Sequence, residues 1–172
     1  METKQAILQR KSTRSYHPDQ LPEEVLNHIL VAGSAAPIAM KKYETMHITV
    51  IQDQGLLSDI NDQLKQNASR PGEPLYGAPT LIVVSSKDNP DTMAYANASC
   101  MLENMFLTAT DQGIGSVYIW SASLVLKANP ELCQKLHLPD GFSPIASGVF
   151  GYPAQPDDSP KLEQVQIETN RI

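Results

Sequence analysis

The sequence has few cysteines, little excess basic charge and no long hydrophobic run. The two cysteines among its 172 residues, Cys100 and Cys133, form no C-x-x-C pair, which excludes a disulfide-built fold and favours a reduced, cytoplasmic protein. No apolar stretch approaches the roughly 20 residues that span a membrane, and the polar N-terminus does not resemble a signal peptide. With 13 basic and 19 acidic residues the net charge is −6, so we expect no nucleic-acid partner and no membrane partner.

The sequence also lacks the motifs of side-chain catalysis. The four histidines show no metal-ligand spacing, and neither a G-x-S-x-G elbow nor a P-loop occurs. The glycines of Gly113-Ile114-Gly115 end a helical pattern and precede a strand, which is the reverse of the order in a dinucleotide fingerprint. We therefore expect no metal and no catalytic side chain. Any chemistry must come from a bound cofactor.

Hydrophobic patterning predicts one domain over residues 1–172, with helices and strands in irregular alternation. That order is typical of an α+β or mixed α/β fold. Runs rich in apolar and β-branched residues predict strands at 47–51, 78–84, 116–120 and 143–150. Helical spacing predicts helices at 3–11, from Pro22 to Ala35, around 57–64 and at 91–112, with a further helix starting at Pro130. The segment 91–112 is apolar or small at most positions, so we expect it to be buried on nearly all sides, with Cys100 inside.

Two features allow more than one interpretation. Arg10, Lys11, Ser12 and Arg14 form the densest basic cluster in an acidic chain. Such a cluster can bind an anion through charge-assisted hydrogen bonds, or it can be a solvated helix end that offsets the helix dipole. Trp120, the single tryptophan, follows an apolar strand and is either a core residue or part of the lining of a flat ligand.

Taken in order, these segments resemble the nitroreductase family of FMN-dependent oxidoreductases. The similar segments are Arg10-Lys11-Ser12-Thr13-Arg14-Ser15-Tyr16, Ala35-Ala36-Pro37-Ile38-Ala39-Met40, the long helix and strand of 97–120, and Gly148-Val149-Phe150-Gly151-Tyr152-Pro153. Each motif is short, but together they cover nearly the whole chain.

The resemblance implies a nitroreductase-like α+β fold, with a central mixed β-sheet flanked by helices. It also implies an intertwined homodimer with two FMN sites at the subunit interface. The tail, residues 151–172, has three prolines within its first ten residues and ends in an alternation of apolar and polar residues. We expect it to reach the partner subunit, since an exposed unpaired strand favours aggregation.

The resemblance also implies which residues line the cofactor. Arg10, Lys11 and Ser12 would bind the FMN phosphate, and Arg14 would lie beside the pyrimidine edge of the ring. Pro37, Ile38 and Ala39 would pack on the ring from the other subunit. The remaining expected contacts are Ile119, Trp120 and Ser121 near flavin N5, and Lys161 near the phosphate.

The implied activity is ping-pong hydride transfer from NAD(P)H, through flavin N5, to a nitro compound, a quinone or a similar acceptor. Three positions depart from the family pattern: Ser121 replaces a common glycine, Lys41 a common asparagine, and Asp157-Asp158 lies near the C-terminal phosphate contact. Two alternatives remain: a flavin-binding protein for storage or a specialised redox step, and a dimer of the same fold without flavin.

Overall fold

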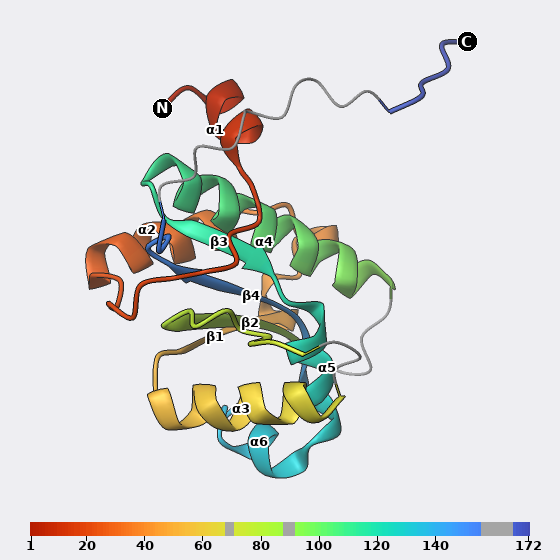
Figure 1. The fold of residues 1–172 in the computed structure, drawn as a ribbon. Coiled ribbons are helices and arrows are strands. Elements are labelled where there is room, and N and C mark those ends of the chain that lie inside the picture. The colour runs from red at the N-terminus through yellow and green to blue at the C-terminus, as the bar shows by residue number, and fades with distance from the viewer. Residues whose placement is uncertain (68–70, 88–91, 156–166) are drawn as a thin grey trace.

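The computed structural model describes residues 1–67, 71–87, 92–155 and 167–172. Helices cover both faces of a central sheet (Figure 1). Helices α1, α2 and α4 lie on one side of the sheet, and α3 and α6 lie on the other, with α5 beside one end of the strands. The helices are α1 (Thr3–Gln9), α2 (Glu23–Ser34), α3 (Gln54–Asn67), α4 (Thr92–Asp111), α5 (Trp120–Ala128) and α6 (Pro130–Gln134), and two short 3₁₀ turns span Ala39–Lys41 and Tyr43–Thr45.

The sheet has four strands in the order β1-β2-β4-β3, and every pair of neighbours is antiparallel. The expectation of a mixed sheet was therefore wrong for these strands. That expectation came from the family resemblance, whereas the chain re-enters the sheet so that β2 starts beside the end of β1, with Ile51 opposite Leu81. A parallel contact does occur outside these strand pairs, as an isolated bridge between Ser12 and Ser116. The strands are β1 (Met46–Ile51), β2 (Thr80–Lys87), β3 (Gly115–Tyr118) and β4 (Phe142–Gly151).

Alternation along β2 places apolar side chains on both faces of the sheet. Ile82 and Val84 join a core cluster with α2 and α4, whereas Leu81 and Val83 join a second cluster with α3, α5 and α6. All four side chains are fully buried. A strand that is buried on both faces has a continuous run of apolar residues in its sequence. This run explains why the sequence pattern predicted β2.

Most predicted elements occur within a few residues of their predicted positions, but α5 was not predicted. The strand expected at 116–120 ends at Tyr118, and the chain enters α5 at Trp120. No side chain caps the start of α5 at Ile119, so the sequence carries no capping signal there. Burial of Ala122 and Leu126 against the second core cluster holds the helix in place.

Helix α4 is less buried than expected. It buries one broad face, whose residues are Ala94, Asn97, Ala98, Met101, Leu102, Met105, Phe106 and Ala109. A second face, formed by Met93, Ala96, Ser99, Cys100 and Glu103, is exposed. The expectation that Cys100 is buried was therefore wrong. Small and apolar side chains suit either side of a helix, so composition did not distinguish the two faces.

The described residues contain no helix that is long and apolar enough to span a membrane.

A glycine in β4 lets the ring of Phe106 approach the backbone of the sheet closely. A Cβ added at Gly148 would lie 2.8 and 2.9 Å from Cε1 and Cζ of Phe106, and 3.3 Å from the carbonyl oxygen of Val117. Phe106 also contacts the ring of Phe150, with centroids 5.5 Å apart, so the ring has little freedom to move.

We predict that Gly148→Ala lowers the free energy of unfolding by about 1–3 kcal/mol through overpacking. The measurement is equilibrium denaturation. The matched control is Gly55→Ala near the exposed start of α3, where the nearest atom to the added Cβ is Oδ1 of Asp53 at 3.3 Å. We expect this control to change stability by less than about 1 kcal/mol. Equal denaturation midpoints for Gly148→Ala and the unmodified protein would contradict the prediction.

Candidate functional site

The basic cluster lies on an extended segment that follows α1 and runs beside β3. The backbone N–H of Thr13 donates to the carbonyl oxygen of Ser116 at 3.0 Å, within the isolated bridge between Ser12 and Ser116. Gly115 permits this approach, because a Cβ there would lie 2.7–2.9 Å from atoms of the Thr13 side chain. The segment is therefore docked against the edge strand of the sheet.

Tyr16 anchors the far end of this segment. Its ring is buried, its hydroxyl donates to the carbonyl oxygen of Thr13 at 2.9 Å, and its backbone bridges to Pro153. Burial raises the pKa of the Tyr16 hydroxyl, and the nearby Tyr76 raises it further, outweighing the opposite effect of Arg14. The hydroxyl therefore stays protonated and keeps its hydrogen bond at any physiological pH.

The cluster has two half-buried cations at one end and exposed groups at the other. Arg10 and Lys11 are half-buried, whereas Ser12 and Arg14 are exposed. Nε of Arg10 lies 3.7 Å from Oε1 of Glu103 on α4. A guanidinium group of Arg14 donates to the carbonyl oxygen of Ser12 at 3.4 Å. Three cations and a hydroxyl within five residues form a donor set suited to a dianion such as a phosphate monoester.

The opposite end of β3 leads to the other predicted contacts. Ile119 is buried, and its backbone N–H donates to the carbonyl oxygen of Ser147 at 2.8 Å. Trp120 is 45% exposed, so it is not a core residue, and its ring lies 5.5 Å from Tyr95 and 6.3 Å from Tyr118. Ser121 is exposed in the first turn of α5, where backbone N–H groups lack partners within the helix.

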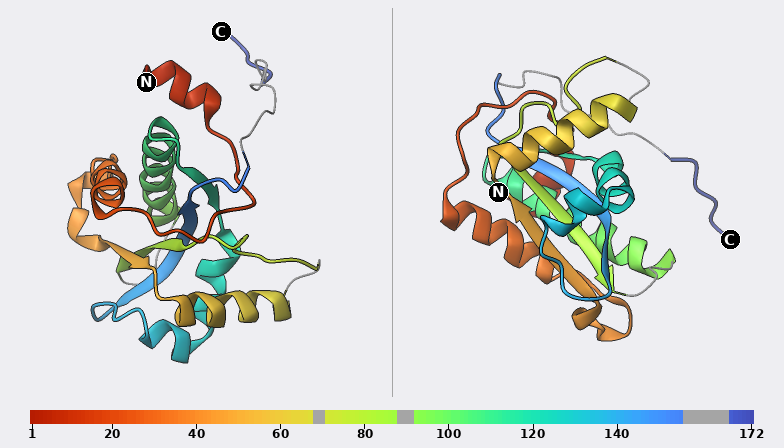
Figure 2. Two further views of the ribbon diagram at one scale, coloured as in Figure 1. Left: turned by 60° about the vertical axis from the view of Figure 1, so that its left-hand side comes forward. Right: turned by 90° about the horizontal axis from the view of Figure 1, so that it is seen from below.

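The segment 37–39 lies apart from the basic cluster. In the left view of Figure 2, α2 and the chain after it lie on one side of α4, and the extended segment after α1 lies on the other. Pro37 is exposed, Ile38 is buried in the core, and the N–H of Ala39 donates to Oδ1 of Asn97 at 3.2 Å. Lys161, the remaining predicted contact, is outside the described residues.

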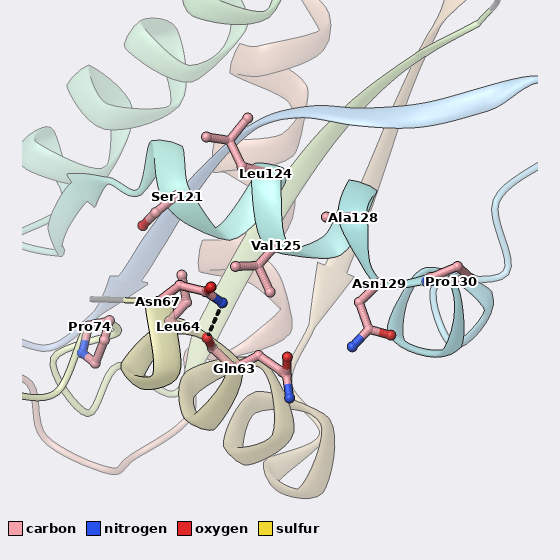
Figure 3. Close-up of a pocket in the computed structure, with 10 residues that line it drawn as sticks. All are labelled: Gln63, Leu64, Asn67, Pro74, Ser121, Leu124, Val125, Ala128, Asn129 and Pro130. Carbon is pink, nitrogen blue, oxygen red and sulfur yellow. Dashed lines mark hydrogen bonds between the residues drawn. The ribbon is translucent and has the colours of Figure 1, made fainter. Parts of the chain in front are cut away.

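A pocket that the sequence did not indicate lies between α3 and α5 (Figure 3). Its volume is about 560 Å³. Ser121 lies at the start of α5, and the pocket follows that helix to its end. The lining residues are spread over distant parts of the chain, so only the packing of α3 on α5 brings them together. Among the described residues, no group of acidic, histidine or cysteine side chains could hold a metal ion.

Residues 7–152 match the model of the nitroreductase family, described as "Nitroreductase family". The chain belongs to this family. The matched region includes Arg10, Lys11, Ser12 and Arg14, the segments 37–39 and 119–121, and every residue that lines the pocket. Lys161 lies beyond it.

Two archaeal relatives of the chain have names that agree with this family assignment. One from Methanothermobacter thermautotrophicus is 27% identical over 159 residues, covering 90% of this chain and 79% of the relative. One from Archaeoglobus fulgidus is 29% identical over 158 residues, covering 88% of this chain and 86% of the relative. Both are named as candidate NADH dehydrogenase/NAD(P)H nitroreductases.

Solved nitroreductase structures have the same fold. A Bacteroides fragilis nitroreductase with bound FMN is 28% identical, with a TM-score of 0.81 over 100% of this chain and 97% of the other. An FMN-dependent nitroreductase from Clostridium difficile has a TM-score of 0.83 over 99% of each chain, at 24% identity. The expected nitroreductase-like α+β fold is thus confirmed.

We predict that Gly115→Ala releases the basic segment from β3. The added Cβ overlaps Thr13, so the segment must move outward, and trypsin should cleave after Arg14 several times faster. Limited proteolysis followed by mass spectrometry measures this rate, with cleavage after Lys135 as the internal reference. Adding Thr13→Gly removes the overlapping atoms and should restore part of the protection. Unchanged cleavage in Gly115→Ala would show that the segment is not held by this contact.

Proposed function

We propose that the protein is an FMN-dependent NAD(P)H oxidoreductase whose cofactor lies along β3. The observation that carries the proposal is the basic segment docked beside β3 through Thr13 and Ser116. It offers phosphate-binding groups at one end of the strand, and the strand leads to the exposed residues Trp120 and Ser121 at the other. The FMN named in the solved Bacteroides fragilis relative supports the same cofactor here.

The residues of this chain fit FMN. Arg10, Lys11 and Ser12 would neutralise and orient the phosphate, because arginine and hydroxyl groups donate directly to phosphate oxygens. Glu103 lies beside Nε of Arg10, which leaves the terminal nitrogens of the guanidinium for an anion. Arg14 would face the pyrimidine edge, where a cation stabilises the negative charge that develops on reduction.

When bound, FMN supplies the two-electron chemistry that these side chains lack. NAD(P)H gives up a hydride and becomes NAD(P)⁺, and the acceptor takes up two electrons and two protons, one of them from solvent. The acceptor that we propose is a quinone, a nitro compound or a similar molecule. The protein's own part is to bind NAD(P)H and the acceptor in turn and to orient the flavin ring. The backbone groups of residues 120 and 121 would face that ring.

The experiment that tests this function is acceptor-dependent NAD(P)H oxidation by the purified protein. Flavin absorbance bands with steady turnover support the oxidoreductase. Bound flavin without turnover supports a storage or specialised role instead, and a protein that neither retains nor binds FMN contradicts the proposal.

We also propose that two copies of the single domain, residues 1–172, form an intertwined homodimer. Apart from Ser99 and Glu103, the exposed face of α4 carries apolar or small side chains at Met93, Ala96 and Cys100, and such a surface favours burial against a partner. The chain that follows α2 lies across α4 from the extended segment after α1 (Figure 2), so we propose that a second copy brings its own segment 37–39 to the cofactor. The tail was expected to reach the partner from residue 151, but Gly151 pairs with Gly115 in the sheet and Pro153 bridges to Tyr16 of the same chain. The part that would extend to the partner therefore begins after Ala154, and residues 156–166 are outside the described part of the chain.

We predict that Arg14→Ala weakens FMN binding. Loss of a charge-assisted hydrogen bond costs about 1.5–3 kcal/mol, which corresponds to a roughly 10- to 150-fold higher Kd. Titration of the flavin-free protein with FMN, followed by flavin fluorescence, measures this constant. Lys4→Ala removes an exposed cation of α1 outside the cluster and should leave the Kd within about twofold. An unchanged FMN affinity and unchanged flavin reduction rate in Arg14→Ala would remove Arg14 from the site.

We predict that Ala96→Arg converts the dimer into a monomer, because it places a charge in the centre of the exposed face of α4. Sedimentation velocity measures the mass in solution. Ser58→Arg, on the exposed side of α3, is the control and should remain dimeric. Deleting the residues after Pro160 should likewise reduce dimer content and retained flavin. A monomeric native protein with FMN bound would contradict the proposed assembly.

A further inference from the structure

A strained turn, residues 39–41, continues the segment 37–39 that we assign to the flavin of the partner subunit. Met40 and Lys41 both have left-handed backbone conformations, with φ of 54° and 57°. Residues with a Cβ rarely adopt this conformation, because the Cβ comes too close to the following carbonyl oxygen. Such strain concentrates at functional sites and persists only where the surrounding structure holds it. The turn therefore needs contacts that keep it from relaxing.

The core side of the chain supplies these contacts. Ile38 is buried in the core cluster of α2 and α4. The backbone N–H of Ala39 donates to Oδ1 of Asn97 on α4 at 3.2 Å. The N–H of Lys41 donates to the carbonyl oxygen of Ile38 at 2.9 Å, whereas the side chain of Met40 is 78% exposed. The turn is thus fixed on its core side and strained on its solvent side.

Asn97 is a polar residue on the buried face of α4. It is 8% exposed, and the other buried residues of this helix are apolar. A buried amide loses its hydration, so it is retained where hydrogen bonds compensate for that loss. Its bond to Ala39 joins residues that lie 58 positions apart in the chain. An apolar side chain would serve the packing of α4, so the amide points to a role in holding the turn.

We propose that Asn97 is a positioning residue for the cofactor. Its side chain holds the strained turn 39–41, so that the segment 37–39 meets the flavin of the partner subunit in a preformed conformation. This inference rests on the proposed function, which brings the segment 37–39 of one copy to the FMN of the other. A preformed contact loses less entropy on binding than a mobile one, so FMN is bound more tightly.

The first test compares two asparagines of α4. Asn97→Ala should raise the Kd for FMN at least fivefold, because the turn relaxes once the N–H of Ala39 has lost its acceptor. Asn104→Ala is the matched control, since Nδ2 of Asn104 donates to the carbonyl oxygen of Ala32 in α2 at 3.1 Å and not to the turn. The control should change the Kd less than twofold. Equal FMN affinities in the two variants would overturn the inference.

The second test separates the strain of the turn from a general role of Asn97 in packing. In the Asn97→Ala background, Lys41→Gly and Lys41→Ala both remove the ammonium group, but only glycine adopts a positive φ without strain. Lys41→Gly should therefore bind FMN at least threefold more tightly than Lys41→Ala. Equal Kd values for the two double variants would show that Asn97 acts through packing alone, which contradicts the proposal.

A mixed dimer tests the action across the subunit interface. One subunit carries Arg14→Ala, the other carries Asn97→Ala, and different affinity tags allow the mixed dimer to be purified. When the turn acts on the flavin of the partner subunit, one site receives both defects and the other receives neither. One of the two sites should then bind FMN with the native Kd. Two weakened sites would show that the turn does not act across the interface, and the proposal would fail.

Amide hydrogen exchange of the unmodified protein keeps the inference testable if the Asn97 variant does not fold. The N–H of Ala39 should exchange at least tenfold more slowly than in an unstructured peptide, and exchange at the peptide rate would overturn the inference. An unmodified protein that binds no FMN refutes the proposed function, while hydrogen exchange still reports whether Asn97 holds the turn. An FMN-binding protein whose Asn97→Ala variant keeps its affinity refutes this inference alone.

Discussion

Burial of both faces of the central strands is the constraint from which the rest of the structure follows. Strand β2 sends Leu81 and Val83 to one face and Ile82 and Val84 to the other, and all four are fully buried. Helices must therefore cover both faces of the sheet, because any uncovered apolar face would remain in water. No solvated sheet face remains on these strands for a ligand, which leaves the edges and the helix ends.

The edge formed by β3 shows how this constraint places the candidate site. Strand β3 has four residues and pairs with β4 on one side only within the sheet. The segment after α1 covers its other side through the bridge between Ser12 and Ser116. An exposed strand edge is a hazard for aggregation, and covering it with a chain segment is a common solution. Here the covering segment also carries Arg10, Lys11 and Arg14, so one contact both protects the edge and positions the cations.

Helix α4 connects the core with the proposed interface. One face carries Met101, Leu102 and Met105 into the core, and the other exposes Met93, Ala96 and Cys100. Glu103 extends from the same exposed region to Arg10. Packing of a second subunit on this helix would thus affect the basic segment directly, which links assembly to cofactor binding in the proposed enzyme.

The sequence by itself determined the main elements, the family and the cationic groups, since each depends on local patterns. The apolar run of β2, the helical spacing of α4 and the spacing of Arg10, Ser12 and Arg14 are visible without coordinates. Only the tertiary structure decided which face of α4 is exposed, because small and apolar residues occur on both sides of the helix. It also decided the antiparallel sheet, since pairing depends on where the chain re-enters the sheet. The α3–α5 pocket, finally, exists only because packing brings together residues from distant parts of the chain, of which the family resemblance had named Ser121 alone.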